Sequence, residues 1–108
     1  MPRHPMPQGA LVMLVLRVLR NDTLHGYAIA QRIRELSDSV LEAEEGSLYP
    51  TLQKMLLEGW VGAEWGLSGT NRRVRLYTIT ADGTRKLKRE LADYKQVTAA
   101  IQTILRLA

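Results

Sequence analysis

The sequence lacks residues on which several classes of protein depend. It has no cysteine and only two histidines, which excludes disulfide frameworks, thiolate metal sites and histidine-based metal clusters. Its apolar run over residues 10–19 contains Arg17 and is shorter than the about 20 apolar residues of a membrane-spanning helix. No small-residue cleavage site follows the run, as a signal peptide would require. These absences favour a cytoplasmic chain without a membrane anchor.

The arrangements needed for catalysis are also missing. His4 lies in a proline-rich segment and His25 stands alone, so no Ser-His-Asp set can be assembled. Glu44 and Glu45 are adjacent and would point in different directions, which is poor geometry for a paired acid and base. No glycine-rich phosphate loop follows a predicted strand. We therefore expect a binding protein without a cofactor or metal, and not an enzyme.

Positive charge is unevenly distributed along the chain. The net charge is +4 over 108 residues, and residues 72–95 carry eight lysines or arginines against three acids. This segment is a candidate anion-binding surface. A net charge of this size can also serve solubility alone. A chain of this length buries only a modest core, so self-association would stabilise it.

Two helices are predicted in the first third of the chain. The first covers residues 8–20, and apolar side chains surround most of it, so one face is expected in the core and another against a partner subunit. The second covers residues 24–37, with Thr23 as its N-cap and Ile29, Ile33 and Leu36 facing inward. Gly26 is expected to permit close helix approach while Tyr27 packs, the alternative being a phosphate contact by His25 or Tyr27. The interface residues expected from the first helix are Leu11, Leu14, Val15 and Val18.

The segment GSLYPTLQKMLLEG, residues 46–59, predicts a third helix with an unusual start. Leu48, Leu52 and Met55 recur at helical spacing and form its core-facing stripe. Proline is best tolerated in the first turn of a helix, so Pro50 predicts a start close to Ser47, which becomes the N-cap. The outward positions then hold Ser47, Tyr49, Pro50, Thr51 and Lys54.

After Gly59 the apolar period changes from 3.6 to 2, which predicts two strands over residues 60–65 and 73–80. The segment GLSGTNRR between them has the composition of a hairpin loop and ends in Arg72 and Arg73. Leu76 and Tyr77 compete for the inward face of the second strand. Trp60 and Trp65 are expected in the sheet and core, with ligand stacking as the alternative.

Thr80 is expected to cap a last helix that runs from residue 81 to 108. Its apolar residues recur at spacings of three, four or seven, as in a heptad seam. A second copy of the chain would cover this seam most simply, and packing on its own first helix is the alternative. The interface residues expected here are Leu87, Leu91, Tyr94, Ile101, Ile104 and Leu105.

Three helices followed by a two-stranded hairpin is the order of a winged helix-turn-helix. We predict a mostly helical α+β fold with a winged-helix DNA-binding domain over residues 1–80 and a dimerisation helix over residues 81–108. The third helix would enter the major groove and the loop would be a wing on the DNA backbone or in the minor groove. The candidate DNA-binding residues are Ser47, Tyr49, Pro50, Thr51, Lys54, Arg72, Arg73 and Arg75.

Several ordered motifs resemble the PadR family of bacterial transcriptional regulators: LHGYAIAQRI at residues 24–33, EEGSLYPTLQKM at 44–55, GW at 59–60 and RRVRLYTITADG at 72–83. EWGLSGTNRR further resembles the subgroup common in acidobacteria. The resemblance implies a homodimer that usually represses transcription, joined by the last helix of one chain on the first helix of its partner. Leu56 and Leu57 depart from the more polar residues of the family, and we expect them to be packed.

The sequence therefore predicts a homodimeric repressor of a pseudo-palindromic double-stranded operator, with half-sites one helical turn or a multiple apart. An effector, a possible small molecule near the first and last helices, would shift the separation of the two reading helices. The competing hypothesis is a winged-helix adaptor that uses the same helix to bind a protein. DNA binding that neutralises several phosphates weakens steeply with salt, and a mostly apolar protein contact does not.

Overall fold

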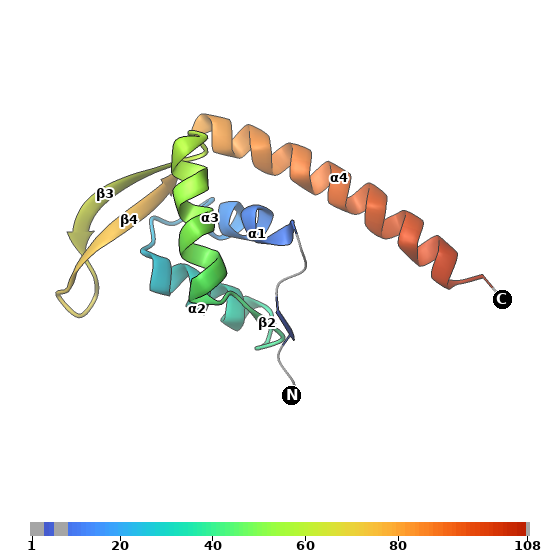
Figure 1. Cartoon of the computed structure of the whole chain (residues 1–108), viewed down its shortest axis with the longest axis horizontal. Helices are drawn as coiled ribbons and strands as arrows, with labels where there is room; N and C mark the ends of the chain where they lie inside the picture. Colours follow the sequence, from blue (N-terminus) through green and yellow to red (C-terminus); the bar gives the residue numbers. More distant parts are fainter. Residues whose placement is uncertain (1–3, 6–8, 108) are drawn as a thin grey trace.

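The computed structural model describes residues 4–5 and 9–107 and shows a mixed α+β chain (Figure 1). Within these residues the helices are α1 (Ala10–Val18), α2 (Gly26–Leu36), α3 (Glu45–Leu57) and α4 (Ala81–Leu105). The wing is the antiparallel pair β3 (Val61–Leu67) and β4 (Arg73–Ile79), and a short parallel pair joins β1 (His4–Pro5) to β2 (Leu41–Glu42). The predicted fold class is confirmed. Residues 8 and 108, the expected ends of the first and last helices, lie outside the described residues.

The core lies where α1, α2 and α3 meet beneath the wing and the start of α4. Helix α1 is at its centre, with Val15 and Leu16 fully buried. Val15 therefore exposes no surface to a partner, and Leu11 and Val18 are also in the core of the chain itself. Of the four α1 residues expected at a subunit interface, Leu14 alone remains partly exposed. The buried α1 residues are Leu11, Met13, Val15, Leu16 and Val18.

Helix α2 begins later than predicted because the residues before it pair with the wing. Leu24 exchanges backbone hydrogen bonds of 3.2 and 2.8 Å with Tyr77, and the hydroxyl groups of Thr23 and Thr78 lie 3.1 Å apart. Thr23 is thus not the N-cap; His25 occupies that position. Ile29 and Ile33 are buried as predicted.

Leu36 lies on the predicted inner face of α2 but is 71% exposed, so its expected burial is wrong. It lines a groove of about 370 Å³ together with Leu14, Val18, Ile33 and Leu41. The apolar face of α2 therefore continues past the point where α1 can cover it.

Helix α3 begins at Glu45, with Glu44 as its N-cap, so the prediction of Ser47 as N-cap is wrong. Pro50 consequently lies beyond the first turn, where its missing N–H leaves the Gly46 carbonyl without its usual helical donor. Both residues are exposed, so water can reach that carbonyl. Glutamate in the first turn is favoured by the helix dipole, which helps to explain the earlier start.

The apolar stripe of α3 agrees with the prediction at most positions. Leu48, Leu52 and Met55 are buried and Leu56 is half-buried. Leu57 is 81% exposed, so its expected packing is wrong. The helix therefore turns a complete face to the core and leaves its remaining surface free.

The wing has a fixed register that decides its inward face. Ala63 is opposite Tyr77, and Trp65 is opposite Arg75. Tyr77 is 7% exposed, whereas Leu76 on the other face is half-buried. Tyr77 therefore points inward. Trp65 shares its face but lies further out and is 61% exposed, which corrects the expectation that this tryptophan is a core residue.

Thr80 joins the end of the wing to α4, as predicted. Its Oγ1 accepts a hydrogen bond of 3.0 Å from the Gly83 N–H and donates one of 2.6 Å to the Gly59 carbonyl. Gly83 must remain without a side chain, because a Cβ there would lie 2.0 Å from the Trp60 carbonyl oxygen. Helix α4 is thus fixed to the end of α3 at its first turn.

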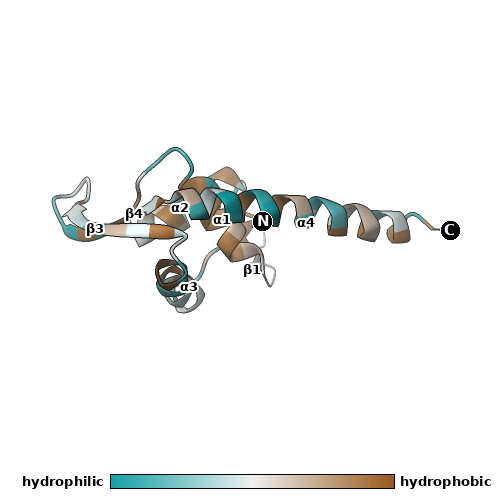
Figure 2. Ribbon diagram, turned by 90° about the horizontal axis from the view of Figure 1, so that it is seen from above, coloured by the Kyte–Doolittle hydropathy of each residue, from teal (hydrophilic) through white to brown (hydrophobic). Residues whose placement is uncertain are grey.

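The C-terminal half of α4 projects away from the body (Figure 1) and gives the chain extents of 56 × 34 × 23 Å. Leu87 is buried in the core, but from Tyr94 onward the apolar residues are half or more exposed. Figure 2 shows these hydrophobic residues recurring along the projecting helix. None of the helices in the described ranges is long and apolar enough to cross a membrane. The exposed apolar residues of this half are Tyr94, Val97, Ile101, Ile104 and Leu105.

Candidate nucleic-acid interface

The first turns of α3 present a polar outer face. Ser47, Tyr49, Pro50 and Lys54 are exposed, as expected for residues that contact a ligand. Thr51 is half-buried, and its hydroxyl donates a hydrogen bond of 2.7 Å to the Ser47 carbonyl. The Thr51 oxygen can therefore still accept a hydrogen bond from a ligand, but its own proton is already used.

The Tyr49 ring lies against the N-terminus of α2, in space that is open because Gly26 has no side chain. A Cβ on Gly26 would lie 2.7 Å from Tyr49 Cε1 and 3.0 Å from its hydroxyl oxygen. The expectation that Gly26 permits a close approach is correct, and the group that approaches is this ring. Burial raises the pKa of Tyr49, and Glu45 and Tyr77 raise it further. The phenol therefore remains protonated at neutral pH and can donate a hydrogen bond to an anion.

The loop at the tip of the wing is closed by its own hydrogen bonds. The Ser68 N–H donates to the Arg72 carbonyl at 2.8 Å, and the Ser68 hydroxyl accepts from the N–H groups of Thr70 and Arg72. Asn71 takes the left-handed conformation with φ of 64°, which asparagine tolerates better than most residues. This network fixes the backbone of the loop up to Arg72, and Arg73 and Arg75 follow in β4.

Two of these arginines lie over the exposed indole of Trp65. The guanidinium carbon of Arg73 is 4.7 Å from the ring centroid and that of Arg75 is 5.9 Å from it. Both distances are in the range of a cation–π interaction. Arg72, Arg73 and Arg75 are all exposed, so the wing carries three cations at its surface.

Two grooves between the wing and the helix N-termini bring together Tyr49 and the three wing arginines, but not Ser47, Pro50 and Thr51. Tyr49 and Arg72 line one groove of about 520 Å³. Tyr49, Arg73 and Arg75 line an adjacent one of about 330 Å³ that also includes Trp65. Tyr49 thus lines both grooves, with Arg72 in one and Arg73 and Arg75 in the other. Lys54 lines neither groove, since it is more than one turn further along α3.

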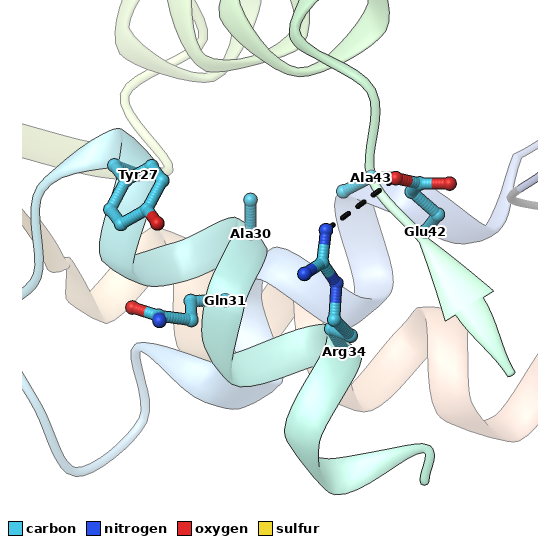
Figure 3. Close-up of a pocket in the computed structure, with 6 residues that line it drawn as sticks. All are labelled: Tyr27, Ala30, Gln31, Arg34, Glu42 and Ala43. Carbon is cyan, nitrogen blue, oxygen red and sulfur yellow. Dashed lines mark ion pairs between the residues drawn. The ribbon is translucent and has the colours of Figure 1, made fainter. Parts of the chain in front are cut away.

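The outer face of α2 carries polar residues that the sequence analysis missed or misjudged, and two of them, Tyr27 and Gln31, line the same groove as Tyr49 and Arg72. Tyr27 is 62% exposed, so the expectation that it packs is wrong. Figure 3 shows Tyr27 and Gln31 beside Arg34, whose guanidinium is 3.5 Å from the Glu42 carboxylate. Tyr27 and Gln31 are four residues apart on one helix, a spacing that could have indicated a shared face.

Acidic residues limit where an anion can approach. Glu44 and Glu45 are both exposed at the start of α3 and would repel phosphate. The favourable electrostatic region is therefore the wing side of Tyr49. Among the described residues, no group of three or more histidines, aspartates and glutamates could hold a metal ion.

Comparison with known proteins agrees with this architecture. A transcriptional regulator from Clostridium thermocellum has a solved structure with a TM-score of 0.84 at 22% identity, covering 92% of this chain and 96% of that one. A PadR family transcriptional regulator from Eggerthella lenta has a TM-score of 0.76 at 30% identity, covering 94% and 86%.

Sequence comparison identifies the same group of proteins. The negative transcriptional regulator PadR of Bacillus subtilis is 30% identical over 73 residues, which are 68% of this chain but only 40% of that protein. The model of the transcriptional regulator PadR-like family matches residues 15–89. The chain therefore belongs to the transcriptional regulator PadR-like family.

Proposed function

We propose that this chain acts as a homodimeric repressor that binds a pseudo-palindromic DNA operator. The observation that carries the proposal is the pair of adjacent grooves between α3 and the wing, one lined by Tyr49 and Arg72 and the other by Tyr49, Arg73 and Arg75. A protonated hydroxyl and guanidinium groups that form no ion pair with any described carboxylate match the phosphate backbone of a duplex.

In this proposal α3 reads bases in the major groove. Its exposed residues Ser47, Pro50 and Lys54 would face base edges or phosphates, and Thr51 would contribute an acceptor oxygen or its methyl group. Lys54 is separated from the wing groove, so we assign it to base or backbone contact within the major groove. Tyr49 would contact phosphate at the border between α3 and the wing.

The three wing arginines would follow the DNA backbone or the minor groove next to the site of α3. Each phosphate they neutralise increases the dependence of DNA affinity on salt. The exposed Tyr27 and Gln31 of α2 line the same groove as Arg72 and are candidate phosphate contacts beside it.

Dimerisation would use the projecting half of α4. Its exposed apolar residues need a partner surface, and the groove beside Leu14 and Leu36 offers an apolar one. Residues 1–80 would then supply the DNA contacts and residues 81–108 most of the dimer contacts. Leu87, expected from the sequence at the interface, is buried in the core of its own chain and is not available to a partner, so the α4 residues proposed at the interface are Leu91, Tyr94, Ile101, Ile104 and Leu105.

Regulation in this proposal works through the same α1 and α4 surfaces. A small-molecule effector bound there would favour one separation of the two α3 helices and release or retain the operator. The protein would act in the cytoplasm as a binding protein and not as an enzyme.

A gel-shift assay with the DNA upstream of the protein's own gene, repeated at several salt concentrations, tests the proposal. We expect preference over random duplex and a linear fall of log affinity with log salt concentration, with a slope of about −0.9 for each phosphate contacted. A protein that binds no duplex at low salt would contradict the proposal and favour the adaptor hypothesis. Sedimentation of the free protein supplies the second readout, since a monomer at micromolar concentration would contradict the dimer.

A further inference from the structure

Trp65 occupies a position on the wing that core packing does not explain. It shares a strand face with Tyr77, which is 7% exposed, yet Trp65 itself is 61% exposed. The body of the domain covers this face at Tyr77 and leaves it open two residues further out. The ring lines the groove that also contains Arg73, Arg75 and Tyr49.

The neighbours of the indole ring are cations. Arg75 is its direct cross-strand partner and Arg73 its diagonal neighbour, at 5.9 and 4.7 Å from the ring centroid. In the described part of the chain, neither guanidinium forms an ion pair with a carboxylate. The indole ring is therefore the group that both guanidinium groups contact. The cations in ion pairs there are Arg32, Arg34, Arg85 and Lys86.

We propose that Trp65 is a positioning residue, which holds the guanidinium groups of Arg73 and Arg75 on the side of the wing that faces Tyr49. The inference rests on the proposed DNA binding and adds the residue that orders its cations. A guanidinium over a ring keeps its N–H donors free at its edge, so it can still donate to phosphate. An arginine that is already restrained loses less conformational freedom on binding than a free one.

Substitution of Trp65 separates this role from a direct contact with DNA. Trp65→Leu removes the π system but keeps an apolar side chain on an exposed strand position. We expect about 3- to 10-fold weaker DNA affinity, because each exposed cation–π contact corresponds to a few-fold in binding. The slope of log affinity against log salt should not change, since both cations remain. Trp65→Phe should recover most of the affinity, and Leu57→Ala, at an exposed apolar residue that lines neither groove, is the control.

A double-mutant cycle gives the decisive result. In a chain that carries Arg73→Ala and Arg75→Ala, Trp65→Leu should cause no further loss of affinity. A loss equal to that in the native background would overturn the inference, because Trp65 would then act on DNA itself. If the two alanine changes alone leave affinity and salt slope unaltered, the wing contacts of the proposed function are wrong.

Arginine side-chain NMR signals test the positioning without DNA. The Nε–H signals of Arg73 and Arg75 should be shifted by the indole ring current in the native protein and return towards ordinary values in Trp65→Leu. Signals at ordinary values in the native protein would overturn the inference while leaving the proposed function intact. Matching far-UV circular dichroism and melting temperature of the variants would establish that they fold.

Discussion

Replacing Gly26 by alanine would move Tyr49 without touching the other outward residues of α3. The new Cβ would lie 2.7 Å from Tyr49 Cε1, whereas ordinary contacts begin at 3.4 Å, so the ring must retreat by about 0.7 Å. Gly26 is not among the glycines with positive φ, so its backbone accepts alanine. The change therefore acts on the tyrosine and not on the fold of the α2 N-terminus.

We expect the variant to bind operator DNA about 10- to 100-fold more weakly. A hydrogen bond from the phenol to a charged phosphate contributes about 1.5–3 kcal/mol, and a displaced hydroxyl forfeits most of it. The free energy of unfolding should change by less than about 1 kcal/mol, because the helix propensity of alanine offsets part of the steric strain. Fluorescence anisotropy with labelled DNA and thermal denaturation measure the two quantities.

Gly62→Ala is the matched control, since a Cβ there meets nothing within 4 Å. It should bind DNA like the native protein. In a Tyr49→Ala background, Gly26→Ala should have no additional effect, because the group it displaces is absent. A folded Gly26→Ala protein with native DNA affinity, or an effect that persists in the Tyr49→Ala background, would refute this reasoning.

Three further changes test other parts of the molecule. Thr80→Val removes the hydrogen bonds to Gly59 and Gly83 and should lower the free energy of unfolding by about 2 kcal/mol. The melting temperature should fall accordingly, and an unchanged melting temperature would show that neither bond contributes to stability. Ile101→Asp, at a position 50% exposed in one chain, should convert the dimer to a folded monomer in sedimentation, and an intact dimer would exclude it from the interface. Lys54→Ala should reduce discrimination between operator and random DNA by about 1–3 kcal/mol in competition assays, whereas equal losses for both DNAs would make it a phosphate contact.

The sequence predicted the elements better than their ends. The apolar stripe at Leu48, Leu52 and Met55 identified α3 correctly, because helical periodicity depends on a face and not on a boundary. The predicted start of α3 was wrong because Pro50 was assigned to the first turn. In the structure Pro50 lies in the second turn, where its exposure lets the helix tolerate it. In the same way Thr23 looked like a cap but serves the pairing with the wing.

Positions at the edges of the core could not be predicted from periodicity alone. Leu36 and Trp65 both lie on the inward side of their elements, yet both are exposed because those elements extend beyond the neighbours that would cover them. The lengths of neighbouring elements in space decide this burial. The site residues on the wing were identified by charge, whereas the stacking of Arg73 and Arg75 on Trp65 depends on the strand register.

The absence of a linker between the wing and α4 has a mechanical consequence. Thr80 both ends the wing and caps the helix, so the 25 residues of α4 form a rod of about 37 Å rigidly mounted at one end. A tilt of 10° at that mounting would carry the far end through about 6 Å, close to one helical turn. In the proposed dimer, a small molecule that separates the two α4 helices would thus change the distance between the two α3 helices. No loop would need to change its conformation.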